Sequence, residues 1–230
     1  VRISRFRELS LIRVAGAVAL IPMNILGLSF GYHDSAAALV NEEGILAAAE
    51  EERFSRSKHD NGFPSRAIDY CLSTNGLTAL EIDTVVYYEN TALKWDRIVS
   101  SYVEELDQHP EYLDRVISSW IYHGKFDPEA AIARYLDMPM SRVCSLNHHQ
   151  SHAASAYFCS PFSGAAVVTM DGVGEYETAT ISHADPDGIT KLISQSFPHS
   201  LGLLYSAVTA FLGFGVNEGE YKVMGMAGFG

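Results

Sequence analysis

Two histidines and one aspartate are the residues of this 230-residue chain whose types and spacing point most directly to chemistry. His148 and His152 are four residues apart, so on a helix both rings project from one face, one turn apart. Two imidazoles at that spacing can hold one metal ion. Asp171 follows the apolar residues 165–170 and precedes Gly172, which predicts a carboxylate where a buried strand enters a glycine turn. The alternative is structural: His148 caps the helix and His152 is a hydrogen-bonded core histidine.

These side chains need rigid elements to hold them. A helix of small residues is predicted from Gln150 to the Ser160–Pro161 pair, after a short strand over residues 142–146. Asp171 would follow a strand over residues 165–170 and begin a turn over residues 171–175. The site is therefore predicted to join one helix and one strand end.

The order of apolar strand, Asp/Gly turn, strand, turn and strand occurs twice in the chain. The first copy has predicted strands over residues 24–30, 36–40 and 45–50, and the second over residues 165–170, 176–183 and 190–197. Sequence identity between the copies is low, so the repeat is architectural. It predicts an α/β fold with two similar lobes, each beginning with a β-meander whose first turn faces a shared cleft.

The segments outside the repeat are predicted from their periodicity and punctuation. Residues 51–60 read as a charged loop, and residues 200–214 read as a buried helix, because they are apolar on most faces. Other predicted elements are helices over 64–74 and 78–81, a strand over 84–88, three helical segments within 91–139, and a glycine-rich segment over 218–230. Aromatic residues in the 91–139 block could line a pocket, although helix packing is the commoner use of such residues.

The composition excludes several classes of function. The net charge of −12 and the lack of a basic stripe argue against nucleic acid as a partner. The three cysteines are scattered and odd in number, which suits reduced thiols in a cytoplasmic protein. The apolar segment 200–214 is too short to span a bilayer, which needs about 20 residues, so no membrane partner is expected.

Residues 1–22 differ in pattern from the rest of the chain. Basic residues there precede an apolar run, which superficially matches a secretory signal. Because the chain begins with Val1 and a strong strand follows Met23, we expect Met23 to be the natural start and residues 1–22 to be an extension without native structure. The chain stops at Gly230 within a glycine-rich segment, so we expect a fragment of a longer protein.

Several motifs together carry a resemblance to a known family. They occur in order at residues 24–28 (NILGL), 33–39 (HDSAAAL), 49–59 (AEEERFSRSKH), 148–156 (HHQSHAASA), 170–175 (MDGVGE), 198–205 (PHSLGLLY) and 219–227 (GEYKVMGMA). The chain from Met23 to Gly230 thereby resembles the O-carbamoyltransferases, which include nodulation enzymes and enzymes that tailor the antibiotics cephamycin and tobramycin. Residues 90–140 match poorly, in the part where such enzymes vary.

The resemblance implies a fold and a domain plan. The N-terminal domain of this family has the actin/sugar-kinase/chaperone-ATPase fold, which is ribonuclease H-like and has two lobes around a cleft. Residues 23–164 would form the first lobe, and residues 165–230 the start of a truncated second lobe. A C-terminal domain, absent from this chain, would make carbamoyl-adenylate from ATP and carbamoyl phosphate. The fragment alone is then expected to be inactive.

The resemblance also implies the reaction and its metal. The N-terminal domain would transfer the carbamoyl group from carbamoyl-adenylate to a hydroxyl of a small molecule. The metal would be Fe(II), or another divalent ion, held by His148, His152 and Asp171 with a further aspartate far downstream. Nothing in the sequence distinguishes an aminoglycoside, a cephem or a nodulation oligosaccharide as the acceptor, and residues 90–140 are expected to shape that choice.

Other residues receive roles as hypotheses. Asp34 would orient or deprotonate the acceptor hydroxyl, with His33 as an alternative base, and Lys58 would offer a cation for developing negative charge. For nucleotide binding, the candidates are Gly172 and Gly202, which allow close backbone approach, and the cation of Lys222. Structural alternatives are a turn aspartate at 34, a solvated charge at 58, and a surface ion pair between Glu220 and Lys222.

Three other functions remain open at this stage. A tRNA threonylcarbamoyl-transfer protein would share the fold and the histidine pair, but the acidic charge argues against it. A non-catalytic two-lobed module could change conformation with nucleotide. A secreted zinc hydrolase would require residues 1–22 to be a true signal, and the chain has no HExxH motif.

Overall fold

The computed structural model describes residues 11–14, 17–20, 23–103, 110–122 and 124–230. The chain divides into two compact units, an N-terminal unit (residues 2–146) and a C-terminal unit (residues 147–230). The division falls before the histidine helix, earlier than the predicted boundary between residues 164 and 165. The reason is that this helix packs on the strands that follow it. Residues Leu11–Val14 (β1) and Ala17–Leu20 (β2) pair as a hairpin, and the rest of the predicted extension lies outside the described residues.

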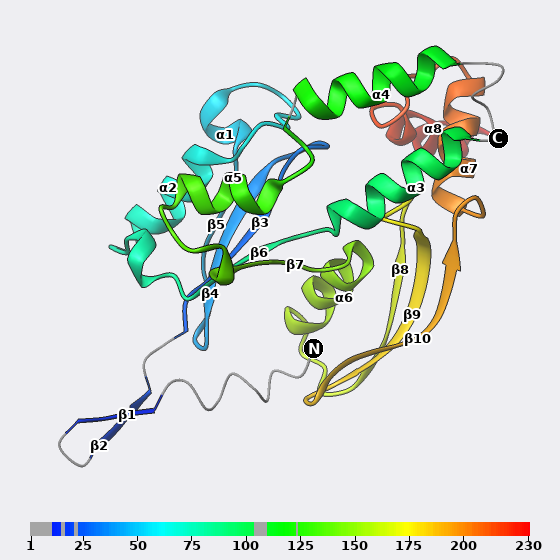
Figure 1. Cartoon of the computed structure of the whole chain (residues 1–230). Coiled ribbons are helices and arrows are strands. Elements are labelled where there is room, and N and C mark those ends of the chain that lie inside the picture. Colours follow the sequence, from blue (N-terminus) through cyan, green and yellow to red (C-terminus); the bar gives the residue numbers. More distant parts are fainter. Residues whose placement is uncertain (1–10, 15–16, 21–22, 104–109, 123) are drawn as a thin grey trace. The chain divides into compact units, whose positions relative to one another are not determined.

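A mixed five-stranded sheet in the order β5-β4-β3-β6-β7 forms the centre of the N-terminal unit (Figure 1). The meander is antiparallel, while β6 and β7 extend the sheet in parallel from β3. The strands are Ile25–Ser29 (β3), Ala36–Asn41 (β4), Gly44–Glu50 (β5), Thr84–Tyr87 (β6) and Val143–Ser145 (β7). The predictions of a first meander and of the α/β class are confirmed.

Helices α2 and α5 pack on this sheet because their apolar residues recur on one face. In α2 the side chains of Ile68 and Leu72 are buried against β4 and β5, and Ile132 of α5 joins the same core. The helices are Glu52–Ser55 (α1), Ser65–Thr74 (α2), Thr91–Val103 (α3), Pro110–Tyr122 (α4) and Pro128–Tyr135 (α5), with 3₁₀ turns at Ala79–Glu81 (η2) and Met140–Arg142 (η3).

The segment predicted as a charged loop, residues 51–60, contains helix α1 and two buried acids. The carboxylate of Glu51 accepts the backbone N–H groups of Arg66 (3.3 Å) and Ala67 (2.8 Å), and so caps α2 from outside the helix. The prediction of a charged loop therefore holds for residues 56–60, whereas residues 52–55 form a helix and two acids are buried where they accept backbone N–H groups.

The C-terminal unit has an antiparallel sheet in the order β10-β9-β8, with helix α6 packed on β8 and β9 (Figure 1). Its elements are His148–Phe158 (α6), Ala165–Met170 (β8), Glu177–Asp185 (β9), Gly188–Ser196 (β10), Leu201–Phe211 (α7), Glu220–Met226 (α8) and Ala227–Phe229 (η4). The second meander is therefore present as predicted. Helix α6 begins at His148, two residues before the predicted start.

Helix α7 departs from its prediction. The segment 200–214 was expected to be buried, yet Thr209 is the one buried residue of α7, and Phe211 is 88% exposed. The apolar composition of a helix indicates that it can be buried, but burial also requires residues that pack against it. The described residues of this unit do not cover α7. None of the helices in the described part of the chain has the length and apolarity needed to cross a bilayer.

Candidate metal centre

Helix α6 begins at His148 because a distant acid caps it. The buried carboxylate of Glu175 accepts the backbone N–H of His148 at 2.9 and 3.1 Å. A carboxylate is favourable at a helix N-terminus, where N–H groups lack partners inside the helix. The Cβ of an alanine at position 174 would lie 2.9 Å from the Cβ of His148, so Gly174 allows the turn to pack closely on this histidine.

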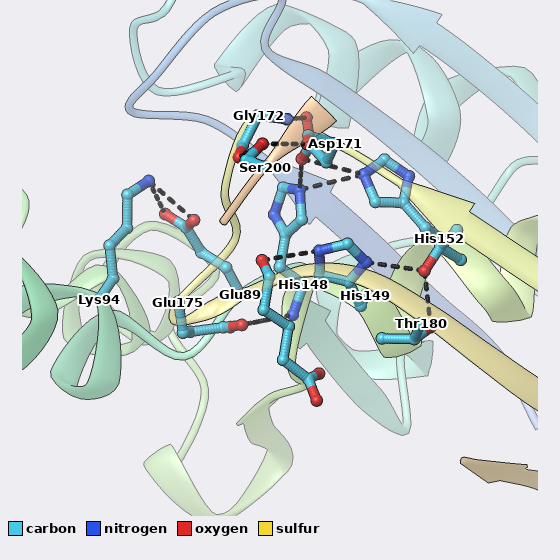
Figure 2. Close-up of polar contacts among 12 residues, drawn as sticks. Glu89, Lys94, His148, His149, His152, Asp171, Gly172, Glu175, Thr180 and Ser200 are labelled. Carbon is cyan, nitrogen blue, oxygen red and sulfur yellow. Dashed lines mark hydrogen bonds and ion pairs between the residues drawn. The ribbon is translucent and has the colours of Figure 1, made fainter. Parts of the chain in front are cut away.

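The three predicted ligands lie together (Figure 2). His148 Nε2 is 2.6 Å from Asp171 Oδ2 and 3.0 Å from His152 Nε2, and His152 Nε2 is 3.6 Å from the same carboxylate oxygen. His148 and His152 come from one face of α6, and Asp171 directly follows β8. The helix spacing and the strand end thus place three donor atoms around one point.

The donor set fits a divalent metal. Ligand atoms about 2.0–2.2 Å from a metal lie about 3.0–3.5 Å from one another in tetrahedral or octahedral geometry. The observed separations are close to this range. Two ring nitrogens and one carboxylate oxygen also match the ligands that Fe(II) and Zn²⁺ take in proteins. Hydrogen bonds from His148 and then His152 hold the pKa of Asp171 below its usual range despite burial, so the carboxylate is ionised.

His149, which the sequence analysis did not single out, anchors the helix that carries the ligands. Its ring is 1% exposed; Nε2–H donates to the backbone carbonyl of Glu177 (2.8 Å), and Nδ1 accepts from the Thr169 hydroxyl (2.7 Å). The Thr180 hydroxyl completes this chain at 2.6 Å from Thr169 Oγ1 (Figure 2). Burial lowers the pKa of His149, which keeps the ring neutral. The sequence signal that could have identified His149 is its position between His148 and His152.

Helix α7 holds the backbone of Asp171 from the other side. Ser200 Oγ accepts the N–H of Leu203 and caps α7, and it lies 2.7 Å from the carbonyl oxygen of Gly172 (Figure 2). The Cβ of an alanine at position 202 would lie 2.5 Å from the carbonyl oxygen of Asp171. The absence of a side chain at Gly202 therefore allows helix α7 to lie against the backbone of Asp171.

Asp34 lies in the N-terminal unit between two histidines. Its two carboxylate oxygens face His33 Nδ1 and His59 Nδ1, each at 2.9 Å. Burial raises the pKa of Asp34, but the hydrogen bonds from His59 and His33 outweigh it and lower the pKa overall. An ionised carboxylate held this way is a weak base and is suited to orienting an imidazole.

Lys58 is 72% exposed, and its ammonium lies 3.0 Å from the carboxylate of Glu52. The Lys58 ammonium and the backbone N–H of His59 lower the pKa of Glu52. Three possible ligand atoms lie within 4.8 Å of one another here: one carboxylate oxygen of Asp34, one of Glu52 and one ring nitrogen of His59. We assign no metal there, because Lys58 already neutralises Glu52 and both Asp34 oxygens accept N–H groups.

Within the glycine-rich segment 218–230, residues Glu220–Met226 form helix α8. Lys222 lies on this helix, and its ammonium lies 5.7 Å from the ring centre of Tyr221 and 5.8 Å from that of Phe214. Residues 220–224 contain no glycine and include the helix formers Glu220, Lys222 and Met224, which favours this helix. Glu220 instead accepts from Ser206 of α7 (2.9 Å) and from the backbone N–H of Asn217 (3.1 Å).

Comparisons with known proteins agree on one family. The family model for the carbamoyltransferase N-terminus matches residues 24–230. An uncharacterised protein of Synechocystis sp. is 44% identical over 213 residues, covering 90% of this chain and 35% of that protein. Nodulation protein NolNO of Sinorhizobium fredii is 32% identical over 222 residues, covering 94% of this chain and 31% of that protein. The chain thus spans about a third of the length of these relatives.

Among solved structures, YeaZ from Pseudomonas aeruginosa aligns with a TM-score of 0.38 and 13% identity, covering 76% of this chain and 68% of that one. At that TM-score the likeness carries no argument about the fold or the site. The family prediction made from the sequence motifs is confirmed by the family match.

Proposed function

Because this chain belongs to the carbamoyltransferase N-terminus family, we propose that it transfers a carbamoyl group from carbamoyl-adenylate to a hydroxyl of a small molecule. The observation that supports this most is the convergence of His148, His152 and Asp171 on one point. ATP and carbamoyl phosphate would supply the carbamoyl-adenylate in a further domain of the longer protein that the relatives represent. A metal on these ligands would act as a Lewis acid toward an oxygen of the donor.

The metal proposed is Fe(II). Two imidazoles and one carboxylate leave coordination positions open, which is the arrangement that non-haem iron and catalytic zinc sites share. His149 and Glu175 would support the site by fixing helix α6, since their contacts hold the helix without using the donor atoms. Such supporting contacts commonly alter metal affinity about 10–100-fold when they are removed.

The proton of the acceptor hydroxyl needs a base, and the geometry favours an imidazole over Asp34. His33 and His59 each direct Nδ1 at the carboxylate, which leaves Nε2 to accept a proton. The hydroxyl oxygen would bond to the carbamoyl carbon, the bond from that carbon to the adenylate oxygen would break, and AMP would leave. The hydroxyl proton would pass to Nε2, and Asp34 would stabilise the resulting imidazolium.

The remaining candidates take narrower roles in this proposal. Lys58 would have to leave Glu52 before its cation could stabilise developing negative charge. The backbone at Gly172 and the α8 residue Lys222 remain candidates for contact with the nucleotide, while Gly202 is needed for packing against Asp171. The acceptor is a small molecule such as an antibiotic or a sugar, and the reaction is placed in the cytoplasm, without nucleic-acid or membrane partners.

We also propose that the chain has the duplicated lobes of the actin/sugar-kinase/chaperone-ATPase fold. Each unit contains a three-stranded antiparallel meander, β3-β4-β5 in one and β8-β9-β10 in the other. This repetition supports the duplicated lobes of the actin-like fold, with the second lobe continuing in the longer relatives. A nucleotide-dependent binding module without catalysis would use the same duplicated plan and is the second candidate.

A substitution with a matched control tests the proposal. We expect His152→Ala in the full-length protein to lose bound iron and carbamoyl transfer, while His183→Ala, an exposed histidine of β9 in the same unit, keeps both. AMP release that depends on carbamoyl phosphate and acceptor separates a transferase from a nucleotide-driven module. Unchanged iron content and turnover in His152→Ala would remove the metal assignment.

A further inference from the structure

The N-terminal unit contains a pocket of about 230 Å³ that has no role in the reaction described so far. It lies at the carboxyl ends of the parallel strands β3 and β6, where the chain continues into Phe30 and Glu89. Ligands commonly bind at this edge of an α/β sheet, because the loops after the strands diverge there. The pocket is closed on its other sides by α3, by Trp120 of α4 and by the loop after α4.

The charged groups around the pocket are mostly cations. Lys94, Arg97 and Lys125 line it together with one carboxylate, that of Glu89. Lys94 binds both oxygens of Glu89 at 2.8 Å, so this buried pair is neutral as a unit. Arg97 and Lys125 add two further cationic side chains to the described lining of this pocket, in a chain whose net charge is −12.

A second, independent observation points to a ligand. Thr91, the first residue of α3, lines the pocket and is 7% exposed, yet its hydroxyl has no hydrogen-bond partner among the described residues. A buried hydroxyl without a partner is costly, so such groups usually meet a ligand or water. Burial and then the neighbouring Lys94 lower the pKa of Lys125, while Glu89 acts in the opposite direction.

Aromatic rings supply the apolar part of the wall. Tyr32, Tyr87 and Trp120 line the pocket, and Trp95 packs against Trp120 with ring centres 4.8 Å apart. Pockets for small organic molecules combine this kind of wall with a few polar groups that fix orientation. An inorganic ion would contact the cations but would not use this aromatic wall.

We propose that this pocket binds a small organic molecule that carries an oxyanion, either a carboxylate or a phosphate, on an apolar or ring-shaped body. Arg97 and Lys125 bind the oxyanion, Thr91 donates its hydroxyl, and the aromatic wall packs on the body. We further propose that this molecule is the hydroxyl acceptor, and this second statement rests on the proposed carbamoyl transfer.

Contacts within the N-terminal unit support that step. The Lys94 ammonium lies 5.2 Å from the centre of the Tyr32 ring, and this ring lies 4.6 Å from that of His33. His33 in turn contacts Asp34 at 2.9 Å. Tyr32 therefore lies between the pocket and the proposed base, so a ligand of the pocket would bring a hydroxyl to His33 by extending past this one side chain.

Tryptophan fluorescence offers a direct assay. The chain has two tryptophans, Trp95 and Trp120, and both are in or directly behind the pocket wall. We would titrate the metal-free full chain with phenyl phosphate, benzoate and neutral benzyl alcohol up to about 10 mM, which detects millimolar affinity. We expect at least one anion to change the fluorescence saturably and to bind about tenfold or more tightly than benzyl alcohol. A preference between the two anions identifies the oxyanion.

Substitutions place the binding in the pocket. Lys125→Gln and Arg97→Gln are each expected to weaken binding of the preferred anion about tenfold, while Arg134→Gln, an exposed arginine of α5 outside the pocket, leaves it unchanged. Thr91→Val keeps the shape of the side chain and removes the hydroxyl. It should weaken binding about threefold or more without lowering the melting temperature of the free protein, because the hydroxyl has no partner there.

Two results would overturn the proposal: no saturable response to either anion, or equal affinities for the Lys125→Gln, Arg97→Gln and Arg134→Gln variants. Lys125 lies in a partly exposed loop, so its variant stays informative if Arg97→Gln does not fold. Because the assay needs neither metal nor carbamoyl donor, its failure leaves the metal site untouched. Loss of the metal site would likewise leave this binding unchanged.

Discussion

Replacing Gly202 by alanine should disturb the candidate metal site through the backbone alone. The added Cβ would lie 2.5 Å from the carbonyl oxygen of Asp171, 2.7 Å from its carbonyl carbon and 2.7 Å from the N–H nitrogen of Gly172. Ordinary contact begins near 3.4 Å, so helix α7 and the Asp171 turn must separate by about 0.9 Å. Metal ligands need placement within about 0.5 Å, so Asp171 would no longer meet His148 and His152 together.

Gly202→Ala changes the free energy of unfolding in two opposite ways. Crowding of this kind costs about 1–3 kcal/mol of unfolding free energy, and the better helix propensity of alanine offsets about 0.5–1 kcal/mol of that. We therefore expect a net loss of stability and a metal affinity reduced about tenfold or more. Equilibrium titration with Fe(II) under anaerobic conditions and urea unfolding of the metal-free chain measure the two effects separately.

Gly225→Ala is the matched control, since this residue of α8 has nothing within 4 Å of an added Cβ. It should keep its metal affinity and gain up to about 1 kcal/mol of stability from propensity alone. If Gly202→Ala binds the metal as tightly as the wild type and unfolds at the same urea concentration, the packing of α7 on Asp171 is not as described.

Three further substitutions test the fold around the sites. Leu39→Ala empties a fully buried core position and should cost about 2–5 kcal/mol in urea unfolding; a loss below about 1 kcal/mol would contradict the packing. Glu51→Ala should cost about 1–2 kcal/mol by uncapping α2, while Glu51→Gln should keep part of that through its remaining carbonyl oxygen; equal losses would argue against a cap. Burial and the hydrogen bond to Asp69 raise the pKa of Tyr135 from 10.0 to about 12. The folded state therefore keeps a proton that the unfolded state releases between pH 10 and pH 12, so the wild type should lose stability over that window relative to Tyr135→Phe, and parallel pH curves would refute this assignment.

The parts of the fold that were predictable depend on neighbours in sequence. Both meanders follow from alternating strands and short Asn, Asp and Gly turns, and the ligand pair on α6 follows from a four-residue spacing. The family motifs added the link to Asp171, which lies 23 residues from His148. Local pattern and resemblance together therefore located the three candidate ligands.

What the sequence did not predict depends on partners far along the chain. Helix α6 starts at His148 because Glu175, 27 residues later, accepts its N–H. Glu51 caps α2 from 15 residues away or more, which buries one acid of a segment expected to be a charged loop. His149 is fixed by Thr169, a contact that no spacing rule anticipates. These polar contacts form only after the chain has folded, so periodicity carries no trace of them.

X-ray absorption at the iron edge of the anaerobically loaded wild-type chain tests the metal centre most directly. We expect about one iron per chain, with imidazole scattering from two histidines and first-sphere distances of about 2.0–2.2 Å. His152→Ala should lower the imidazole contribution to one ring if any iron is retained. A wild-type chain that retains no iron, or iron bound without imidazole, would contradict the site formed by His148, His152 and Asp171.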